Sequence, residues 1–183
     1  MCGICGILKR NESEIHLPSV IKSMCNSIKH RGPDDEGFAL FKLNDEFHVS
    51  VGSTDTQATA WNTDYNYSPK YHIEELSDTF QLALGHRRLS VIDLSEAAHQ
   101  PMCLTDNDIW ITLNGEIYNY IELKNELTEK GYNFISRSDT EVLLNAYKEW
   151  GIDCLQKLNG MWSFVIYDKR KNILFGSRDR FGV

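Results

Sequence analysis

The second residue of this chain is a cysteine, and it begins a glycine-containing apolar run in the sequence MCGICGI. Removal of the initiator methionine would leave Cys2 with both a thiol and a free α-amine. An unperturbed α-amine has a pKa of about 7.7–8.0, against about 10.4 for lysine, so it can accept a proton near neutral pH. Because the thiolate is the nucleophilic form of cysteine, Cys2 is a candidate nucleophile that carries its own base. The plainer alternative is a structural cysteine in a buried strand behind a retained Met1.

Cys2 and Cys5 also form a C-x-x-C pair. A zinc or redox centre of this kind needs a second pair of ligands or a thioredoxin-like βαβ context. The cysteines at 25, 103 and 154 have no close cysteine or histidine partner in the sequence, and His30 supplies only a third ligand. We therefore expect no metal site, with a C-x-x-C metal module as the alternative.

Two further groups could serve a cysteine nucleophile. Asn114-Gly115 follows a predicted strand and offers a side-chain amide and a backbone N–H to a tetrahedral oxyanion, although Asn-Gly is equally typical of a hairpin turn. Arg88 and Asp139 could bind the carboxylate and the ammonium of a small amino acid. Their ordinary alternatives are a solvated surface charge and an acidic residue that favours a helix N-terminus.

The elements that must position these residues can be placed from hydrophobic spacing and from helix and turn signals. One helix is expected over 17–29, a second from Tyr120 to the capping glycine Gly131, and a third from the capping box at 138–141 to Gly151. Residues 30–35 are expected to be a loop, and 52–78 a long, irregular surface excursion. The expected strands are residues 2–9, 38–43, 47–51, 79–84, 109–113, 161–168 and 172–176. Strands at both ends with helices between them favour the α+β class.

Composition restricts the classes of partner. The chain has 183 residues, 42% hydrophobic and 25% charged, as in one globular domain with a substantial core. A formal net charge of -7 without a basic stripe argues against nucleic acid. No apolar run could cross a bilayer and no signal peptide is recognisable, so we expect no membrane partner. Five scattered cysteines are typical of a reducing compartment, and we expect a cytoplasmic protein.

Several longer blocks follow the N-terminal Met-Cys-Gly-Ile in a fixed order. They are HRGPDDEG (30–37), GHRRLSVIDL (85–94), QPM (100–102), LNGEIYNY (113–120), SDTEVLLNAYKEWG (138–151), LNGMWSFVIYD (158–168) and GSRDRFGV (176–183). This ensemble resembles the glutaminase domain of the class II glutamine amidotransferases, most closely the asparagine synthetase type. The resemblance spans essentially the whole chain.

The resemblance implies an α+β fold, the four-layer αββα sandwich of two antiparallel sheets that is called the N-terminal nucleophile hydrolase fold. It implies that Cys2 is the nucleophile, and that Asn114 (side chain) and Gly115 (backbone N–H) form the oxyanion hole. The residues that it implies for binding glutamine are Arg88 on the α-carboxylate, Glu116 and Asp139 on the α-ammonium, Asn114, and Leu89 and Val91, whose backbone groups line the pocket.

The implied reaction is hydrolysis of L-glutamine to glutamate and ammonia through a Cys2 thioester. The ammonia would pass to a C-terminal synthetase domain that uses ATP and magnesium to make asparagine from aspartate. We expect residues 1–183 to be the glutaminase domain alone, ending before that second domain and needing no cofactor itself. A homodimer is one arrangement that the sequence leaves open.

Two alternatives stay open at this point. The 52–78 excursion is longer than in compact asparagine synthetases, so the ammonia acceptor could instead be a sugar or a surface-polysaccharide carboxylate. The other alternative is a glutamine-binding module without catalysis, although no matched position is substituted in a way that favours it.

Overall fold

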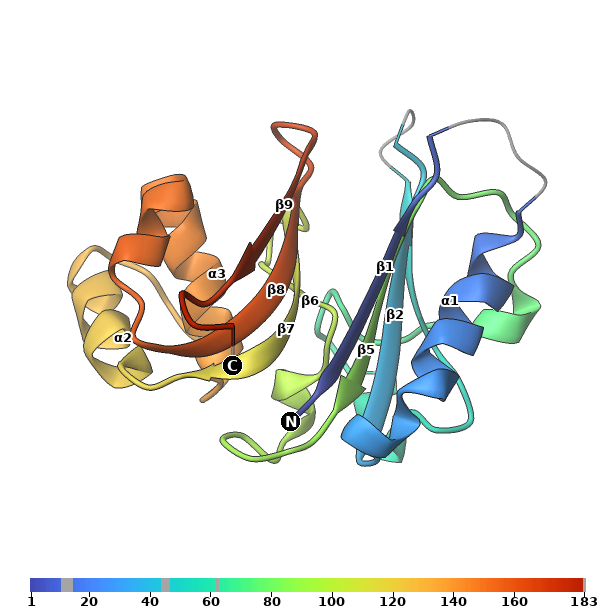
Figure 1. Cartoon of the computed structure of the whole chain (residues 1–183), viewed down its shortest axis with the longest axis horizontal. Helices are drawn as coiled ribbons and strands as arrows, with labels where there is room; N and C mark the ends of the chain where they lie inside the picture. The colour runs from blue at the N-terminus through green and yellow to red at the C-terminus, as the bar shows by residue number, and fades with distance from the viewer. Residues whose placement is uncertain (11–14, 44–46, 62, 183) are drawn as a thin grey trace.

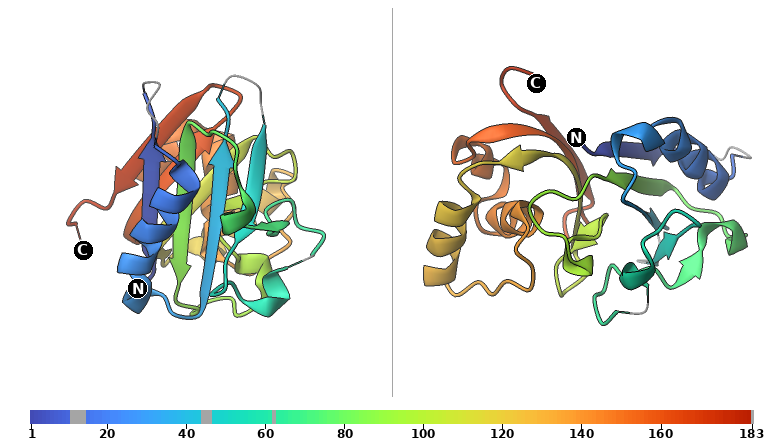
Figure 2. Two further views of the ribbon diagram at one scale, coloured as in Figure 1. Left: turned by 90° about the vertical axis from the view of Figure 1, so that its right-hand side faces the viewer. Right: turned by 90° about the horizontal axis from the view of Figure 1, so that it is seen from below.

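The computed structural model describes residues 1–10, 15–43, 47–61 and 63–182. Its strands form two sheets that face each other, and helices cover the outer face of each sheet (Figures 1 and 2). α1 (Leu17–Ser27) covers one sheet, and α2 (Tyr120–Glu129) and α3 (Asp139–Trp150) cover the other. These four layers confirm the predicted α+β sandwich.

The first sheet has five strands and the second has four. In spatial order the first consists of β1 (Gly3–Leu8), β5 (Leu82–Arg88), β2 (Asp35–Phe41), β3 (His48–Gly52) and β4 (Tyr71–His72). The second consists of β6 (Met102–Cys103), β7 (Ile109–Ile117), β8 (Gly160–Asp168) and β9 (Ile173–Arg178). All pairs are antiparallel except β3 with β4, which is parallel, so the expectation of purely antiparallel sheets is wrong at this short edge strand.

β5 shows how one strand serves two layers, because successive side chains point to opposite faces of a sheet. Leu82 and Leu84 belong to the apolar core between the sheets, which continues through β7 to α3. Ala83 belongs instead to a second core beneath α1, and a Cβ on Gly85 would lie 2.6 Å from Cys25 Sγ of that helix. His86 therefore faces the second sheet, whereas Arg87 faces α1.

Residues 52–78 are less superficial than the sequence suggested. Within the described part of this segment, Tyr67 and Ile73 are buried at 2% and 1% exposure, and the Tyr67 hydroxyl donates to Ala97 O at 2.7 Å. The segment also contributes β4 and two short 3₁₀ turns. The polar composition of this segment did not predict these buried residues. A few isolated apolar side chains can hold a segment against the core without producing a periodic pattern.

The ends of α3 follow the predicted signals with one difference. Ser138 caps the helix by accepting a hydrogen bond from Thr140 N–H, and Gly151 ends it with a φ of 61°. Glu141 does not bond back to the Ser138 N–H as a capping box would. Its carboxylate accepts from Ile135 and Ser136 N–H instead, so it fixes the approach to the helix.

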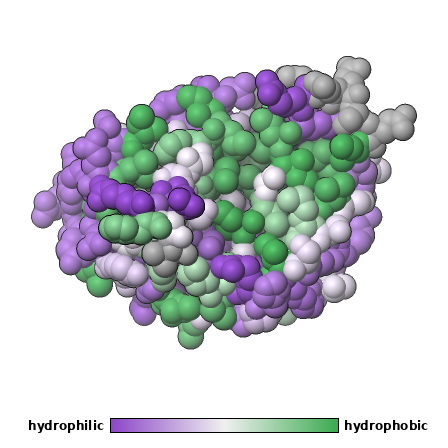
Figure 3. Space-filling model, in the orientation of Figure 1, coloured by the Kyte–Doolittle hydropathy of each residue, from purple (hydrophilic) through white to green (hydrophobic). Residues whose placement is uncertain are grey.

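Within the described residues no helix is both long and apolar enough to cross a bilayer. On the face shown in Figure 3, hydrophilic residues predominate at the end formed by α2, and hydrophobic residues are more frequent towards the middle.

Candidate active site

A cavity of about 120 Å³ lies where the N-terminal end of β1 meets the second sheet. Figure 1 shows the N-terminus at this place, between the two sheets. The predicted site residues that line the cavity are Cys2, Arg88, Leu89, Val91, Gly115, Glu116 and Asp139. Asn114 lines a smaller adjoining cavity, which shares Gly115 and Met1 with the first. The fold thus brings together residues that are up to 137 positions apart in the chain.

Cys2 is held by backbone groups on two sides. Leu89 N–H lies 3.3 Å from the Cys2 sulfur, and Arg31 Nε donates to the Cys2 carbonyl at 3.0 Å. Burial raises the pKa of the thiol, while the bond from Leu89 and the positive charges of the N-terminus and Arg88 oppose this rise. A thiol whose pKa is raised needs a base close by in order to form the thiolate. Removal of Met1 would free the α-amine of Cys2, which could accept this proton.

The C-x-x-C pair is divided between two environments. Cys2 lines the cavity, whereas a hydrogen bond from Cys25 of α1 lowers the pKa of Cys5. No group of three or more histidine, cysteine, aspartate or glutamate side chains within the described chain is placed to hold a metal ion. The metal-module alternative therefore finds no support in the arrangement of these two residues.

Asn114 and Gly115 lie inside β7, opposite Ser163 and Trp162 of β8, so the hairpin-turn alternative is wrong. A side chain at position 115 would meet backbone, because a Cβ there would lie 2.3 Å from Met161 O. The Asn114 side-chain oxygen is buried without a hydrogen-bond partner among the described residues. A buried amide oxygen without a partner is unusual, but this oxygen is an acceptor, and the donor that an oxyanion would need is the Nδ2 amide group of the same side chain.

The backbone N–H of Gly115 points to the strand edge that faces away from β8. Leu113 N–H, two residues earlier, bonds to the Gln100 side chain at 2.8 Å. Ile117 N–H, two residues later, bonds to the Asp139 carboxylate at 3.0 Å. N–H groups two residues apart point the same way along a strand, so that of Gly115 lies between these two bonded neighbours. It is placed to donate to a group in the cavity.

Arg88 ends β5 and is 4% exposed. Its Nη1 donates to Ser95 O at 3.0 Å, and its Nη2 donates to Asp93 O. These bonds hold the guanidinium against the loop that follows β5 and leave further N–H donors among its five. A planar guanidinium fixed in this way can bind a carboxylate through two parallel hydrogen bonds.

The other two predicted residues on this wall of the cavity lie in the loop that follows β5. Leu89 contacts Cys2 through its N–H, as described above, and Val91 lies at the rim with 67% of its surface exposed. Asp93 anchors the loop by accepting bonds from Ser95 N–H and Arg137 N–H. Burial works to raise the pKa of Asp93, but the hydrogen bond from the Ser95 hydroxyl, together with these two bonds and the charge of Arg88, outweighs it and the pKa is lowered.

The opposite wall is acidic. Asp139 begins α3 and is 5% exposed, and burial raises its pKa against the hydrogen bonds from Ile117 and Thr140 N–H. The negative charge of Glu116 raises it further. Two carboxylates facing one cavity are a cost without a cation, and a bound ammonium group would relieve it.

Three residues that contact this site were not identified from the sequence. Arg31 holds the Cys2 carbonyl, while His86 and Gln100 bond to the backbone of Leu113, next to the candidate oxyanion donors. All three stand in the blocks that carry the family resemblance, and that position was the available signal. Their residue types alone suggest no particular chemistry.

The walls together combine a thiol, two candidate oxyanion donors, a guanidinium and two carboxylates. Comparison with known proteins identifies the family to which this chain belongs. The sequence profile described as "Glutamine amidotransferase domain" matches residues 72–183. The chain belongs to the glutamine amidotransferase domain family.

Relatives of this amidotransferase domain match it from end to end. It is 37% identical over 185 residues to asparagine synthetase (glutamine-hydrolyzing) 1 of Bacillus subtilis, covering 100% of this chain and 23% of that protein. Asparagine synthetase (glutamine-hydrolyzing) 3 of the same organism is 33% identical, with 100% and 24% covered. The chain thus spans about a quarter of the length of these relatives.

The fold has solved counterparts. The glutamine phosphoribosylpyrophosphate amidotransferase of Bacillus subtilis superposes with a TM-score of 0.66 at 21% sequence identity, covering 91% of this amidotransferase domain and 35% of that chain. This likeness confirms the sandwich architecture.

Proposed function

We propose that this amidotransferase domain hydrolyses L-glutamine to glutamate and ammonia, with Cys2 as the nucleophile. The observation that supports this most directly is the shared cavity. One wall carries the Cys2 thiol and the Arg88 guanidinium, and the other carries the Gly115 N–H and the Asp139 carboxylate. A ligand spanning these walls needs an electrophilic carbon at one end and an amino-acid head group at the other.

In the proposed reaction the free α-amine of Cys2 takes the thiol proton, and the sulfur attacks the side-chain amide carbon of glutamine. The Asn114 amide and the Gly115 N–H donate to the oxyanion that forms. The protonated amine then gives its proton to the leaving nitrogen, the C–N bond of the tetrahedral intermediate breaks, and ammonia departs to leave a Cys2 thioester. Water attacks the thioester with the same amine as base, which releases glutamate and restores the thiol.

Removal of Met1 is part of the proposal. Met1 lines both the main cavity and the adjoining one, so its loss frees the α-amine and enlarges the space beside Cys2. The mature form is therefore the form to assay.

Arg88 on one side, and Glu116 and Asp139 on the other, explain selectivity for an α-amino acid. Each buried charge would be left unpaired by a compound that lacks the matching group, and such mismatches cost more than a missing methylene group. We expect glutaramate, which lacks the α-ammonium group, to be hydrolysed far more slowly than L-glutamine.

The decisive experiment follows glutamate release from L-glutamine by protein whose lack of Met1 has been verified by intact mass. Cys2→Ala should abolish release, and 6-diazo-5-oxonorleucine should label Cys2. Cys103→Ala, which removes a buried thiol that does not line the cavity, should retain activity. Labelling at another residue, or turnover by Cys2→Ala, would refute the proposal.

The destination of the ammonia is a further part of the proposal. Because the matched asparagine synthetases are about four times longer than this chain, we propose that the parent protein carries an ATP- and magnesium-dependent synthetase domain that converts aspartate to asparagine. The full-length protein should form asparagine from glutamine, ATP and aspartate. Its Cys2→Ala variant should do so only with free ammonia. Product formation from a sugar carboxylate but not from aspartate would redirect the proposal to another acceptor.

A further inference from the structure

The two halves of the site are built on different sheets. Cys2 precedes β1 and Arg88 ends β5 in the first sheet, whereas Asn114 and Gly115 lie on β7 in the second. The distance from the sulfur to the oxyanion donors is therefore not set within one ladder of backbone hydrogen bonds. It depends on the side chains that cross from one sheet to the other.

His86 makes such a crossing beside the site. It lies on β5, is 0% exposed, and its Nε2 lies 3.0 Å from Leu113 O on β7. A carbonyl only accepts, so Nε2 carries the proton and donates. The imidazole Nδ1 is buried without a hydrogen-bond partner among the described residues. Burial lowers the pKa of His86 to about 4, which leaves the ring neutral at physiological pH.

Gln100 bonds to the backbone N–H of the same residue, Leu113. Its Oε1 accepts from Leu113 N–H at 2.8 Å, and its Nε2 donates to Thr140 Oγ1 at 3.2 Å. The loop that carries Gln100 lies close to the first sheet because position 37 is glycine, where a Cβ would be 2.3 Å from Gln100 O. Gln100 thus connects β7 to the start of α3, next to Asp139.

Both backbone polar groups of Leu113 are consequently fixed by side chains from outside β7. The Leu113 carbonyl belongs to the peptide plane that also contains the Asn114 nitrogen, and that plane is rigid. A tilt of this plane would move the Asn114 side chain and the Gly115 N–H together. Misplacement of donors by about 1 Å is enough to cost about 10²-fold in rate.

We propose that His86 and Gln100 are positioning residues that clamp the Leu113 peptide and thereby hold the Asn114–Gly115 donors at the correct distance from Cys2. The inference rests on the proposed glutaminase function and adds to it the elements that align the two sheets. His86 does not line the cavity, and Gln100 lines it with both amide atoms already bonded to Leu113 and Thr140, so neither residue is proposed to bind glutamine.

The test uses the full-length protein that carries this chain, with Met1 removed, and compares His86→Leu with His86→Gln. Glutamine can place its amide nitrogen where the histidine has Nε2, so His86→Gln restores the donor and His86→Leu does not. We expect kcat for glutamine hydrolysis to fall about 10- to 100-fold in His86→Leu and to recover most of that loss in His86→Gln.

Binding separates positioning from general damage. In a Cys2→Ala background, the Kd for L-glutamine should change less than about threefold on adding His86→Leu, because Arg88, Glu116 and Asp139 bind the head group. Should His86→Leu not fold, Gln100→Met removes the other half of the clamp and should give the same loss of kcat.

Thr112→Val is the matched control. Thr112 also reaches the first sheet from β7, through Oγ1 to Gly85 O at 3.4 Å, but it does not hold the peptide beside the donors. Its kcat should stay within about threefold of wild type. The inference is overturned if His86→Leu and Gln100→Met keep wild-type kcat, if His86→Gln does not recover, or if glutamine binding falls in step with kcat. Absence of glutaminase activity in the wild type would instead refute the proposed function itself.

Discussion

The polar side chains on the two faces of β5 differ in how completely they are hydrogen-bonded. On the face towards the second sheet, His86 and the neighbouring Asn114 of β7 each retain a buried polar atom with no hydrogen-bond partner among the described residues. On the face towards α1, Arg87 uses its whole guanidinium: Nε donates to Cys25 O, Nη1 to Asp55 and Nη2 to Asn26.

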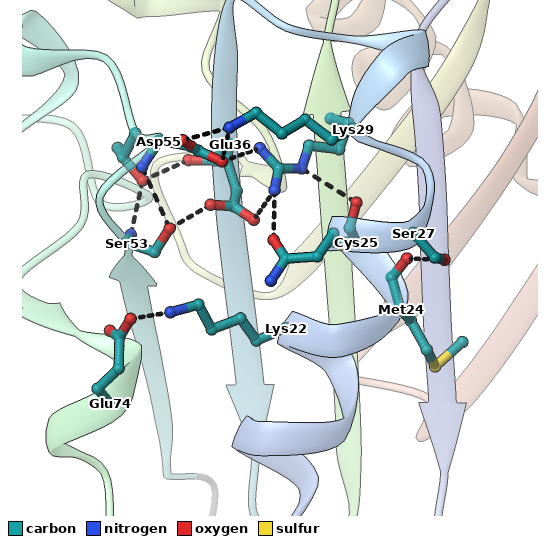
Figure 4. A network of polar contacts seen from close by, with 12 residues as sticks. Lys22, Met24, Cys25, Ser27, Lys29, Glu36, Ser53, Asp55 and Glu74 are labelled. Carbon is teal, nitrogen blue, oxygen red and sulfur yellow. Dashed lines mark hydrogen bonds and ion pairs between the residues drawn. The ribbon is translucent and has the colours of Figure 1, made fainter.

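Figure 4 shows the network on that outer face, in which Glu36 lies among Ser53, Asp55 and the end of α1. Arg87 Nη2 lies 2.8 Å from Glu36 Oε1, an ion pair that is not aligned as a hydrogen bond, and both side chains are almost fully buried. Ser53 donates to the other oxygen of Glu36. The outer network joins α1, β2, β5 and the segment after β3.

This difference in hydrogen bonding indicates which substitutions should affect stability and which should affect catalysis. Buried polar groups normally find partners, and the outer network does so within the protein. On the inner face, Asn114 lines a cavity where a ligand could contact it, whereas His86 is fully buried and does not line either cavity. We therefore expect outer substitutions to lower stability and inner substitutions to lower turnover.

The largest effect should come from breaking the outer network. Arg87→Met leaves Glu36 buried without its charge partner, and loss of one member of a buried ion pair costs about 3–5 kcal/mol. Urea unfolding would measure this loss, and kcat of the folded fraction should change less than about threefold. The exposed Arg10→Met should change stability by no more than about 0.5 kcal/mol. A large loss of kcat with little loss of stability would reverse the comparison.

Next comes the inner face. Asn114→Ala removes a proposed oxyanion donor and should lower kcat by about 10²–10³-fold. The free energy of unfolding should change by about 1 kcal/mol or less, since no hydrogen bond of this side chain to the described residues is lost. The exposed Asn133→Ala is the control and should have no effect on either quantity. Unaltered kcat in Asn114→Ala would exclude it as a donor.

Protonation of His86 should make the stability of the protein depend on pH. Its pKa of about 4 lies below the usual value near 6.5, so between these values the unfolded chain binds more protons and stability falls as pH falls. Relative to His86→Gln, wild type should lose up to about 3 kcal/mol between pH 7 and pH 4. Urea titrations across this range would measure it. The charged groups acting on the ring are Asp35, whose charge raises the pKa, and His99 and Arg88, whose charges lower it. Equal slopes for the two proteins would show that His86 is not buried as a neutral ring.

The smallest effect should come from a surface ion pair that does not involve β5. Lys157 Nζ lies 2.8 Å from Glu126 Oε1, with 38% and 40% of the two side chains exposed. Solvent screens such pairs, so Glu126→Gln should cost less than about 1 kcal/mol. Chemical denaturation at low and high salt would check this, and a cost comparable to that of Arg87→Met would contradict it.

Much of this organisation could be predicted. Hydrophobic spacing placed α1 and α3, and turn residues placed the β8–β9 hairpin, because these signals are local. The position of Cys2 in the chain made it a candidate, and the order of the motif blocks selected it as the nucleophile. Arg88, Gly115 and Asp139 were predicted through the order of the motif blocks, and the fold brings them to one cavity with Cys2.

Other features could not be predicted. Asn114-Gly115 suits a turn by residue type, and only its pairing with β8 makes it part of a strand. β4 and β6 are two residues long, too short to show a period. The anchors of residues 52–78 are isolated apolar side chains whose partners lie far away in the sequence. In each case the information is in a contact between distant segments.

The sequence by itself determined the class of fold, the candidate nucleophile and the residue types around it, because periodicity, capping signals and motif order are carried by short stretches of chain. Only the tertiary structure decided which of the adjacent residues His86 and Arg87 faces the second sheet, and which side chains bond to Leu113 next to the proposed oxyanion donors. Strand register and the meeting of two sheets settle these points. Both arise from packing between segments many residues apart, which no local pattern encodes.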